Sequence, residues 1–170
     1  MGSVVRALVL ADTHVGEGST RQLPDQVWAA MGDVDVVLHA GDVVDSATLE
    51  AIASSKPLHA VLGNNDHGLR AVLPERLELV LAEVPIALVH ETGTTAGRER
   101  RMQKWFPGAR VVIFGHSHMP CNQWVDRQLL FNPGSSTWKR TAPAHTYGVL
   151  EFAAGEVVRH EIVAVAQSTA

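Results

Sequence analysis

The sequence predicts an α/β domain with mixed β-sheets and helices packed outside them. Two observations predict this fold class. In the first half of the chain, short apolar runs typical of buried strands alternate with stretches of helical periodicity. From residue 76 onward, several strands follow one another through short turns, as in hairpins. Parallel strands joined by crossovers, followed by antiparallel hairpins, indicate a mixed sheet or two packed sheets.

The first half of the chain supplies three strands and two helices in alternation. Pro24 suits the first turn of a helix, and Gly32 suits its end. Ser46 is a suitable N-cap for a second helix, in which Leu49 and Ile52 lie on one face. The predicted strands are residues 4–10, 35–40 and 58–62, and the predicted helices are residues 24–31 and 46–54.

The second half supplies seven strands and one helix. The helix, residues 95–106, is basic and ends before Pro107-Gly108, while Ala154-Gly155 marks the turn of a closing hairpin. The predicted strands are residues 76–81, 86–89, 111–114, 123–125, 128–131, 147–152 and 157–162. Residues 167–170 look like a loose tail. We expect residues 1–170 to form a single domain, because no linker or repeat interrupts them.

The composition argues against several classes of protein. A hydrophobic content of 46% with 19% charged residues is ordinary for a globular domain, and the formal charge of −4 argues against bulk nucleic-acid binding. The one cysteine, Cys121, cannot form an internal disulfide. No segment reads as a secretory signal or a membrane span, so a cytoplasmic protein without a membrane partner is expected.

A pair of histidines follows one of the most apolar strands. Residues 111–114 lead into Gly115-His116-Ser117-His118. Side chains alternate along extended backbone, so His116 and His118 point roughly the same way, past the end of the sheet. Two imidazoles aimed at one place can bind a metal ion, although such residues can also be exposed polar groups of a turn.

The same pattern of polar residues after a strand occurs at four other strand ends. A single Asp or Asn in such a place is usually a turn former. All these strand ends together predict a metal site, because ligands gather at the carboxyl ends of strands joined by crossovers. The candidate metal ligands are Asp12, His14, Asp42, Asn64, His90, His116 and His118.

Seven donors are too many for one tetrahedral ion. They suit two divalent ions that share a bridging carboxylate and lie roughly 3.5–4 Å apart. Mixed carboxylate, amide and imidazole donors favour manganese, with iron, zinc and nickel as alternatives, over a calcium cage. A hydroxide bridging two such ions could attack phosphorus in line with the leaving group. The residues therefore predict a metal-dependent phosphoesterase that acts on a small phosphoester.

In this order, the motifs Asp12-Thr13-His14, Gly41-Asp42, Gly63-Asn64-Asn65-Asp66, His90 and Gly115-His116-Ser117-His118 resemble the signature of calcineurin-like metallophosphoesterases. The segment Asn132-Pro133-Gly134-Ser135 is similar to that of the small single-domain YfcE-type branch, which also includes the phosphoesterase-like subunit of the retromer coat. The resemblance implies a four-layer α/β/β/α sandwich and phosphodiesterase or phosphatase activity.

The resemblance also implies a role for each donor. It assigns Asp12, His14 and His118 to one ion, Asn64, His90 and His116 to the other, and Asp42 to both. Asp42, Asn64 and His116 would then act in catalysis through the bound ions, and Asn65 would lie on the leaving-group side. Asn132 and Ser135 match a loop near the site, although a tight Pro-Gly turn explains that segment equally well.

Two residues depart from the pattern of the family. Asn65 stands where many members have a histidine that helps protonate the leaving group, and an amide cannot deliver a proton. We therefore expect better turnover of substrates with good leaving groups; His67 could substitute, or be an exposed turn residue. Glu91 stands where the family usually has glycine, and it could face away, orient a ligand or narrow the pocket.

The remaining notable side chains have structural interpretations. His39 is expected to be a hydrogen-bonded core histidine, and Trp105, Trp124 and Trp138 are expected in the core or an interface. The basic residues of the third helix could face an anionic substrate or merely be solvated; they are Arg98, Arg100, Arg101 and Lys104. Two alternatives stay open: an interaction scaffold of the same fold without useful catalysis, and assembly into a homo-oligomer.

Overall fold

Two five-stranded sheets face each other in the computed structural model, which describes residues 2–16 and 18–167. The first sheet has the order β10-β9-β1-β2-β3 and the second the order β4-β5-β6-β8-β7. The strands are β1 (Val5–Leu10), β2 (Val36–His39), β3 (Leu58–Ala60), β4 (Arg76–Leu81), β5 (Val84–Val89), β6 (Val111–Ile113), β7 (Cys121–Val125), β8 (Gln128–Asn132), β9 (Thr146–Ala153) and β10 (Glu156–Ala164). The helices are α1 (Asp25–Gly32), α2 (Ser46–Ser55), α3 (Arg98–Trp105) and the short 3-10 helix η1 (His67–Leu69).

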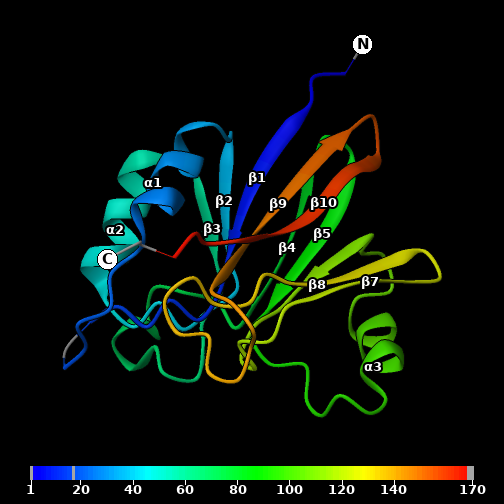
Figure 1. Ribbon diagram of the computed structural model, residues 1–170. Helices are drawn as coiled ribbons and strands as arrows, with labels where there is room; N and C mark the ends of the chain where they lie inside the picture. The colour runs from blue at the N-terminus through cyan, green and yellow to red at the C-terminus, as the bar shows by residue number, and fades with distance from the viewer. Residues whose placement is uncertain (1, 17, 168–170) are drawn as a thin grey trace.

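Each sheet combines parallel and antiparallel pairs. In the first sheet β1, β2 and β3 are parallel, and the closing hairpin β9–β10 joins the edge of β1 in antiparallel register. In the second sheet β5, β6 and β8 are parallel, while β4 and β7 are antiparallel edge strands. The predicted mixed sheets are thus confirmed, and the carboxyl ends of the parallel strands converge at one edge of the molecule (Figure 1).

Side chains that alternate between the two faces of each buried strand create the layers. In β1, Ala7 and Val9 pack between the two sheets, whereas Leu8 and Leu10 pack beneath α1 and α2. Because successive side chains in a strand point to opposite faces, an apolar run fills both interfaces at once. On the second sheet, Val112 contacts the cluster beneath α3, which includes Met102. The order of layers is helices, sheet, sheet, helix, as the four-layer α/β/β/α sandwich requires (Figure 1).

The predicted element boundaries differ from the observed ones by a few residues. The third helix begins at Arg98 instead of residue 95, because Gly97 adopts the left-handed conformation with φ of 74°. The third strand ends at Ala60 instead of residue 62, since the backbone N–H of Leu62 donates to the carbonyl of Pro74 outside the sheet. Most of the predicted tail, residues 168–170, lies outside the described residues.

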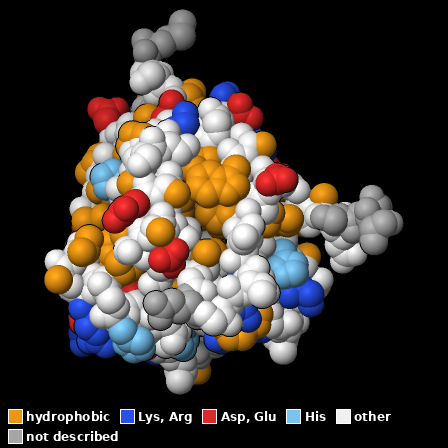
Figure 2. Space-filling view, turned by 90° about the vertical axis from the view of Figure 1, so that its left-hand side faces the viewer, with side chains coloured by type: hydrophobic (Ala, Val, Ile, Leu, Met, Phe, Trp, Pro, Cys, Tyr) orange, Lys and Arg blue, Asp and Glu red, His pale blue; other side chains and the backbone are white. Residues whose placement is uncertain are grey.

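The face covered by α1 and α2 carries a cluster of hydrophobic side chains with acidic ones around it (Figure 2). On α1, Trp28 is 36% exposed and lines a shallow hollow together with Leu23 and Ala51.

None of the helices in the described part of the chain combines the length and the apolar character needed to cross a bilayer.

Candidate metal centre

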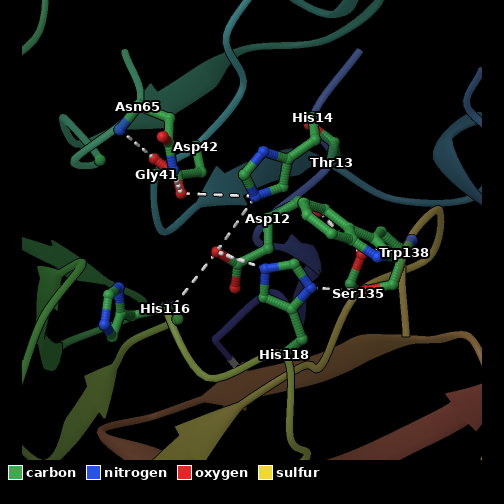
Figure 3. A network of polar contacts seen from close by, with 12 residues as sticks. Asp12, Thr13, His14, Gly41, Asp42, Asn65, His116, His118, Ser135 and Trp138 are labelled. Carbon is green, nitrogen blue, oxygen red and sulfur yellow. Dashed lines mark hydrogen bonds and ion pairs between the residues drawn. The ribbon is translucent and has the colours of Figure 1, made fainter. Parts of the chain in front are cut away.

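The seven candidate ligands come together where the parallel strands of both sheets end. Figure 3 labels Asp12, His14, Asp42, His116 and His118 among them. The first sheet contributes four of them, and the second contributes three. Asp12 and His14 follow β1, Asp42 follows β2, Asn64 follows β3, His90 follows β5, and His116 and His118 follow β6. Residues more than 100 positions apart in the sequence, such as Asp12 and His118, thus lie next to each other.

The backbone of this site is strained in a consistent way. Five of the seven residues have a positive φ, between 43° and 72°, which non-glycine residues adopt infrequently. They are Asp12, His14, Asp42, His116 and His118. Such conformations persist only where the surrounding structure enforces them, and they concentrate at functional sites. The strand-end loops are therefore built to hold these side chains at the cost of local strain.

One group of donors is deeply buried. The Oδ1 atom of Asp12 lies 3.5 Å from Nε2 of His118 and 4.0 Å from Nε2 of His14. Asp12 is fully inaccessible to solvent. Its Oδ2 atom and the Nε2 atoms of both histidines find no hydrogen-bond partner among the described residues. Leaving buried polar atoms unpaired is costly, so the two unpaired Nε2 atoms, which both face Oδ1 of Asp12, fit a bound cation.

The other group is more open to solvent. The Oδ1 atom of Asn64 lies 2.9 Å from Nε2 of His90 and 3.2 Å from Nδ1 of His116. His90 is buried, but the side chain of His116 is 50% exposed. A hollow of about 270 Å³ begins beside Asn64 and His90 and extends toward Arg70 and Arg76. Of the two donor groups, this one is therefore the more accessible to a substrate.

Asp42 lies between the two groups. Its Oδ2 atom is 3.4 Å from Nε2 of His14 and 3.4 Å from Nε2 of His90. Burial alone would raise the pKa of Asp42, but the hydrogen bond and positive charge of His90 and the hydrogen bonds of Asn65 hold that pKa well below its usual range. Asp42 is thus an ionised carboxylate within contact distance of donor atoms from both groups.

Backbone carbonyls orient two of the imidazoles. The Nδ1 atom of His90 lies 2.8 Å from the carbonyl of Ala40, and Nδ1 of His118 bonds the carbonyl of Trp138. A carbonyl can only accept, so Nδ1 of each ring carries a proton, and Nε2 of each ring would offer its lone pair to a metal ion in the neutral form of the imidazole. Burial also lowers the pKa of His118 to about 4 and lowers the pKa of His14, which favours the neutral form that metal binding requires.

Asp12 has the opposite shift. Burial raises the pKa of Asp12 to about 7, against the opposing charge of His90 and with the help of the nearby Asp42 charge. A buried carboxylate that is reluctant to ionise needs a compensating positive charge. A divalent cation between Asp12, His14 and His118 would supply that charge.

Two further residues brace the loops of the site. Asp66 accepts hydrogen bonds from the backbone N–H groups of Asp42, Val44 and Gly63, at 2.6–2.9 Å. Ser135 donates to the carbonyl of Asp12 at 2.7 Å. Asp66 belongs to a motif that the sequence showed, but nothing in the sequence indicated that its carboxylate would join two loops.

The segment around Asn132 is more than a turn. The Nδ2 atom of Asn132 donates to the carbonyl of Gly115 and to Oγ of Ser117, at 3.2 and 3.3 Å, while its Oδ1 accepts from the N–H of Gly134. Asn132 thus holds the loop between His116 and His118. Asn132 and Ser135 position the ligand loops, and neither is a candidate ligand by its contacts.

Comparison with known proteins identifies the family of this chain. Residues 5–155 match the calcineurin-like phosphoesterase superfamily domain. The chain belongs to this family. A probable metallophosphoesterase of Methanothermobacter thermautotrophicus is 30% identical over 134 residues, which are 78% of this chain and 77% of the relative.

Two solved structures share the fold of this calcineurin-like phosphoesterase. A zinc complex of Vps29 from Entamoeba histolytica superimposes with a TM-score of 0.77 at 20% identity, covering 95% of this chain and 98% of the other. An archaeal phosphodiesterase superimposes with a TM-score of 0.71 at 21% identity, covering 94% and 100%. At these identities the likeness concerns the fold.

One tryptophan lies in a different place from the one predicted. Trp138 was expected in the core or an interface, but its ring meets the rings of His14 and His118 edge-on, with centroids 5.0 and 5.2 Å away. The guanidinium groups of Arg21 and Arg140 lie 4.1 and 4.7 Å from the centroid of the Trp138 ring. Trp138 therefore forms a wall of the buried donor group, and no local pattern in the sequence indicated this contact.

Several other predicted side chains have defined contacts. His39 is fully buried and contacts Oγ1 of Thr13, and it accepts from the N–H of Gly41, so the prediction of a core histidine is confirmed. Arg98 and Arg101 of α3 bind Thr92 and its neighbours, which favours a structural role for that basic helix over contact with a substrate. His67 is exposed.

The two residues that depart from the family pattern, Asn65 and Glu91, also have defined positions in the structure. Asn65 is turned toward Asp42: its backbone N–H and its Nδ2 donate to the two carboxylate oxygens, each at 2.8 Å. Glu91 does not face away, because its Oε1 atom lies 3.6 Å from Nδ1 of His116.

Proposed function

We propose that this protein is a phosphoesterase that uses two divalent metal ions to hydrolyse a small phosphoester, with phosphodiesters as the preferred substrates. Asp12, His14 and His118 would hold one ion. Asn64, His90 and His116 would hold the other, and Asp42 would contact both. One observation carries the proposal: donors from both sheets converge in one place, and the buried Nε2 atoms of His14 and His118 have no hydrogen-bond partner among the described residues.

When bound, such ions supply positive charge to the non-bridging oxygens of the phosphate and make a water acidic enough to act as a nucleophile near neutral pH. The chain supplies the placement. Asp42 stays ionised because Asn65 donates a hydrogen bond to each of its carboxylate oxygens. The open side at Asn64 and His116 admits the phosphoester, while the buried side excludes solvent from Asp12.

The amide of Asn65 sets an expectation for the leaving group. An amide cannot donate a proton to an alkoxide, and Asn65 is occupied with Asp42. Substrates whose leaving group departs as a stable anion, such as aryl phosphodiesters, are therefore expected to react faster than alkyl esters.

Manganese is the first choice for both ions, with iron, zinc and nickel as alternatives, because the donors are mixed oxygen and nitrogen atoms. The zinc complex of the Entamoeba Vps29 supports divalent metal binding by this fold. A cytoplasmic location is part of the proposal, since Cys121 cannot form an internal disulfide.

The test is hydrolysis of bis(p-nitrophenyl) phosphate by the manganese-loaded protein and by Asp42→Ala and His116→Ala variants. We expect both variants to lose at least about a hundredfold in kcat/KM, because each lacks a group that binds an ion. His160→Ala is the matched control, since His160 contacts Asn122 and Trp124 instead of the site. Equal rates for all four proteins would exclude the proposal.

A second candidate is an interaction scaffold without useful catalysis. The replacement of a histidine by Asn65 and the likeness to the fold of Vps29 favour it. A metal-replete protein that is inert across a broad panel of phosphoesters, yet keeps a stable partner through purification, would support the scaffold over the enzyme.

A further inference from the structure

We propose that Glu91 is an additional ligand of the ion that Asn64, His90 and His116 would hold. The inference rests on the proposed function, because it requires an ion at that position. It gives a role to a side chain that the family pattern does not explain. With Glu91, this ion would have two imidazoles, one amide oxygen and one carboxylate oxygen that it does not share with the other ion.

The distances between donor atoms support this assignment. Neighbouring ligands of one ion, each about 2.1 Å from it, lie about 3.0 Å apart in octahedral geometry and about 3.4 Å apart in tetrahedral geometry. Nδ1 of His116 lies 3.6 Å from Oε1 of Glu91, and the Oδ1 atom of Asn64 lies 3.2 Å from the same nitrogen. One ligand atom each from His90, Glu91 and His116 lies within 4.8 Å of the other two.

The end of β5 explains how neighbouring residues can serve one ion. Within a strand, successive side chains point to opposite faces, so His90 and Glu91 would diverge. The strand ends at Val89, and the chain bends at His90. The bend is fixed because Nδ1 of His90 bonds the carbonyl of Ala40 and the N–H of Gly115 bonds the carbonyl of His90. Glu91 is thereby directed to the open side of the centre.

The charge balance gives a reason for the contact. Two divalent ions carry four positive charges, while Asp12 and Asp42 supply two negative ones. Asn64, His90 and His116 add none, so the ion they would hold shares only the Asp42 charge. Glu91 would bring a third negative charge and a second carboxylate oxygen, which suits hard divalent ions such as manganese.

Competing partners for Glu91 are close, and it does not use them. Arg70 and Arg76 line the same hollow, but among the described residues Glu91 forms its ion-pair contact with His116 alone. The guanidinium of Arg76 instead lies 4.1 Å from the centroid of the Trp105 ring. The Glu91 carboxylate is 53% exposed, so a replacement there should not disturb the core.

The experiment is a calorimetric titration of the metal-free full chain with manganese chloride, followed by electron paramagnetic resonance of the loaded protein. Wild type is compared with Glu91→Gln and with the matched control Glu75→Gln, which removes the same charge from the same hollow. We expect wild type and Glu75→Gln to bind two ions alike. Glu91→Gln should bind one ion as before and the other at least about tenfold more weakly. The spin coupling between the two ions should weaken in parallel.

The outcomes separate this inference from the proposed function. Two ions bound with unchanged affinity in Glu91→Gln would overturn the role of Glu91 and leave the two-metal centre standing. Equal weakening in Glu91→Gln and Glu75→Gln would also overturn it, because the effect would then come from charge in the hollow. Fewer than two ions in wild type would overturn the two-metal proposal and this inference together.

Discussion

At the scale of single residues, the two hydrogen bonds from Asn65 to Asp42 change what Asn65 is expected to do. Both carboxylate oxygens of Asp42 receive a hydrogen bond from this residue, one from its backbone and one from its amide. A hydrogen bond to a charged group contributes about 1.5–3 kcal/mol. Asn65 is therefore better described as a residue that positions Asp42 than as one that faces the leaving group.

This leads to a prediction for Asn65→Ala. The variant should lose about ten- to a hundredfold in kcat/KM, because Asp42 would be held less firmly and less ionised. The loss should be the same for every leaving group. Rates for a series of aryl phosphodiesters, plotted against leaving-group pKa, check this. A steeper slope in the variant would instead assign Asn65 to the leaving-group side.

The glycine before Asn64 gives a second prediction at this scale. A Cβ atom at Gly63 would overlap the backbone nitrogen and the carboxylate of Asp42, whereas a Cβ at Gly68 would meet open space. Gly63→Ala should therefore displace Asp42, lower the free energy of unfolding by about 1–3 kcal/mol and weaken metal binding. Gly68→Ala is the control. Urea unfolding and metal titration measure both effects, and indistinguishable variants would contradict the prediction.

At the scale of elements, local patterns identified nearly every strand and helix. The alternation of Ala7 and Val9 with Leu8 and Leu10 fills two interfaces, so the apolar run of β1 was readable without its neighbours. Boundaries were less predictable because they depend on contacts elsewhere. The conformation of Gly97 shortens α3, and the bond from Leu62 to Pro74 shortens β3.

In the site, too, some features could be predicted from the sequence and others could not. Its donors were predictable because each follows a strand, and parallel strands end at one edge. The contact of Trp138 with His14 and the bonds of Asp66 to another loop were not predictable. Those contacts form only when loops far apart in sequence close over the site.

The end of β2 carries a prediction about pH. His39 is buried, and burial lowers its pKa from 6.5 to about 3. Between pH 6.5 and about 3, His39 is therefore protonated in the unfolded chain but neutral in the folded protein. The stability from neutral His39 is complete above pH 6.5. It falls as pH drops toward 3, by up to about 1.4 kcal/mol per pH unit.

Urea unfolding of the metal-free protein between pH 7.5 and about 4.5 checks this against His39→Asn. The oxygen of asparagine can accept the N–H of Gly41 but does not titrate. The lowered pKa values of His14 and His118 also reduce the stability as pH falls, whereas the raised pKa of Asp12 increases it. These three contributions are the same in both proteins. The difference between the two slopes isolates His39. Identical slopes would contradict the assignment.

At the scale of the whole molecule, the donors are divided between the two sheets. The loops of the first sheet hold Asp12, His14, Asp42 and Asn64, and the loops of the second hold His90, His116 and His118. Each proposed ion would take ligands from both sheets, since His118 joins Asp12 and His14, and His90 and His116 join Asn64. The ions would therefore link the two halves of the sandwich at the edge where the interior cluster ends.

Metal binding should accordingly stabilise the whole fold. A ligand bound only by the folded state raises the free energy of unfolding by about 1.4 kcal/mol for each tenfold increase in free ligand above its Kd, so two ions should give about 2.8 kcal/mol. His118→Ala leaves Asp12 and His14 without a donor from the second sheet, so it should show about half of that dependence. Urea unfolding at several free manganese concentrations measures the slopes. Equal slopes in the two proteins would mean that His118 holds no ion, and a zero slope in wild type would mean that the sheets are not linked by metal at all.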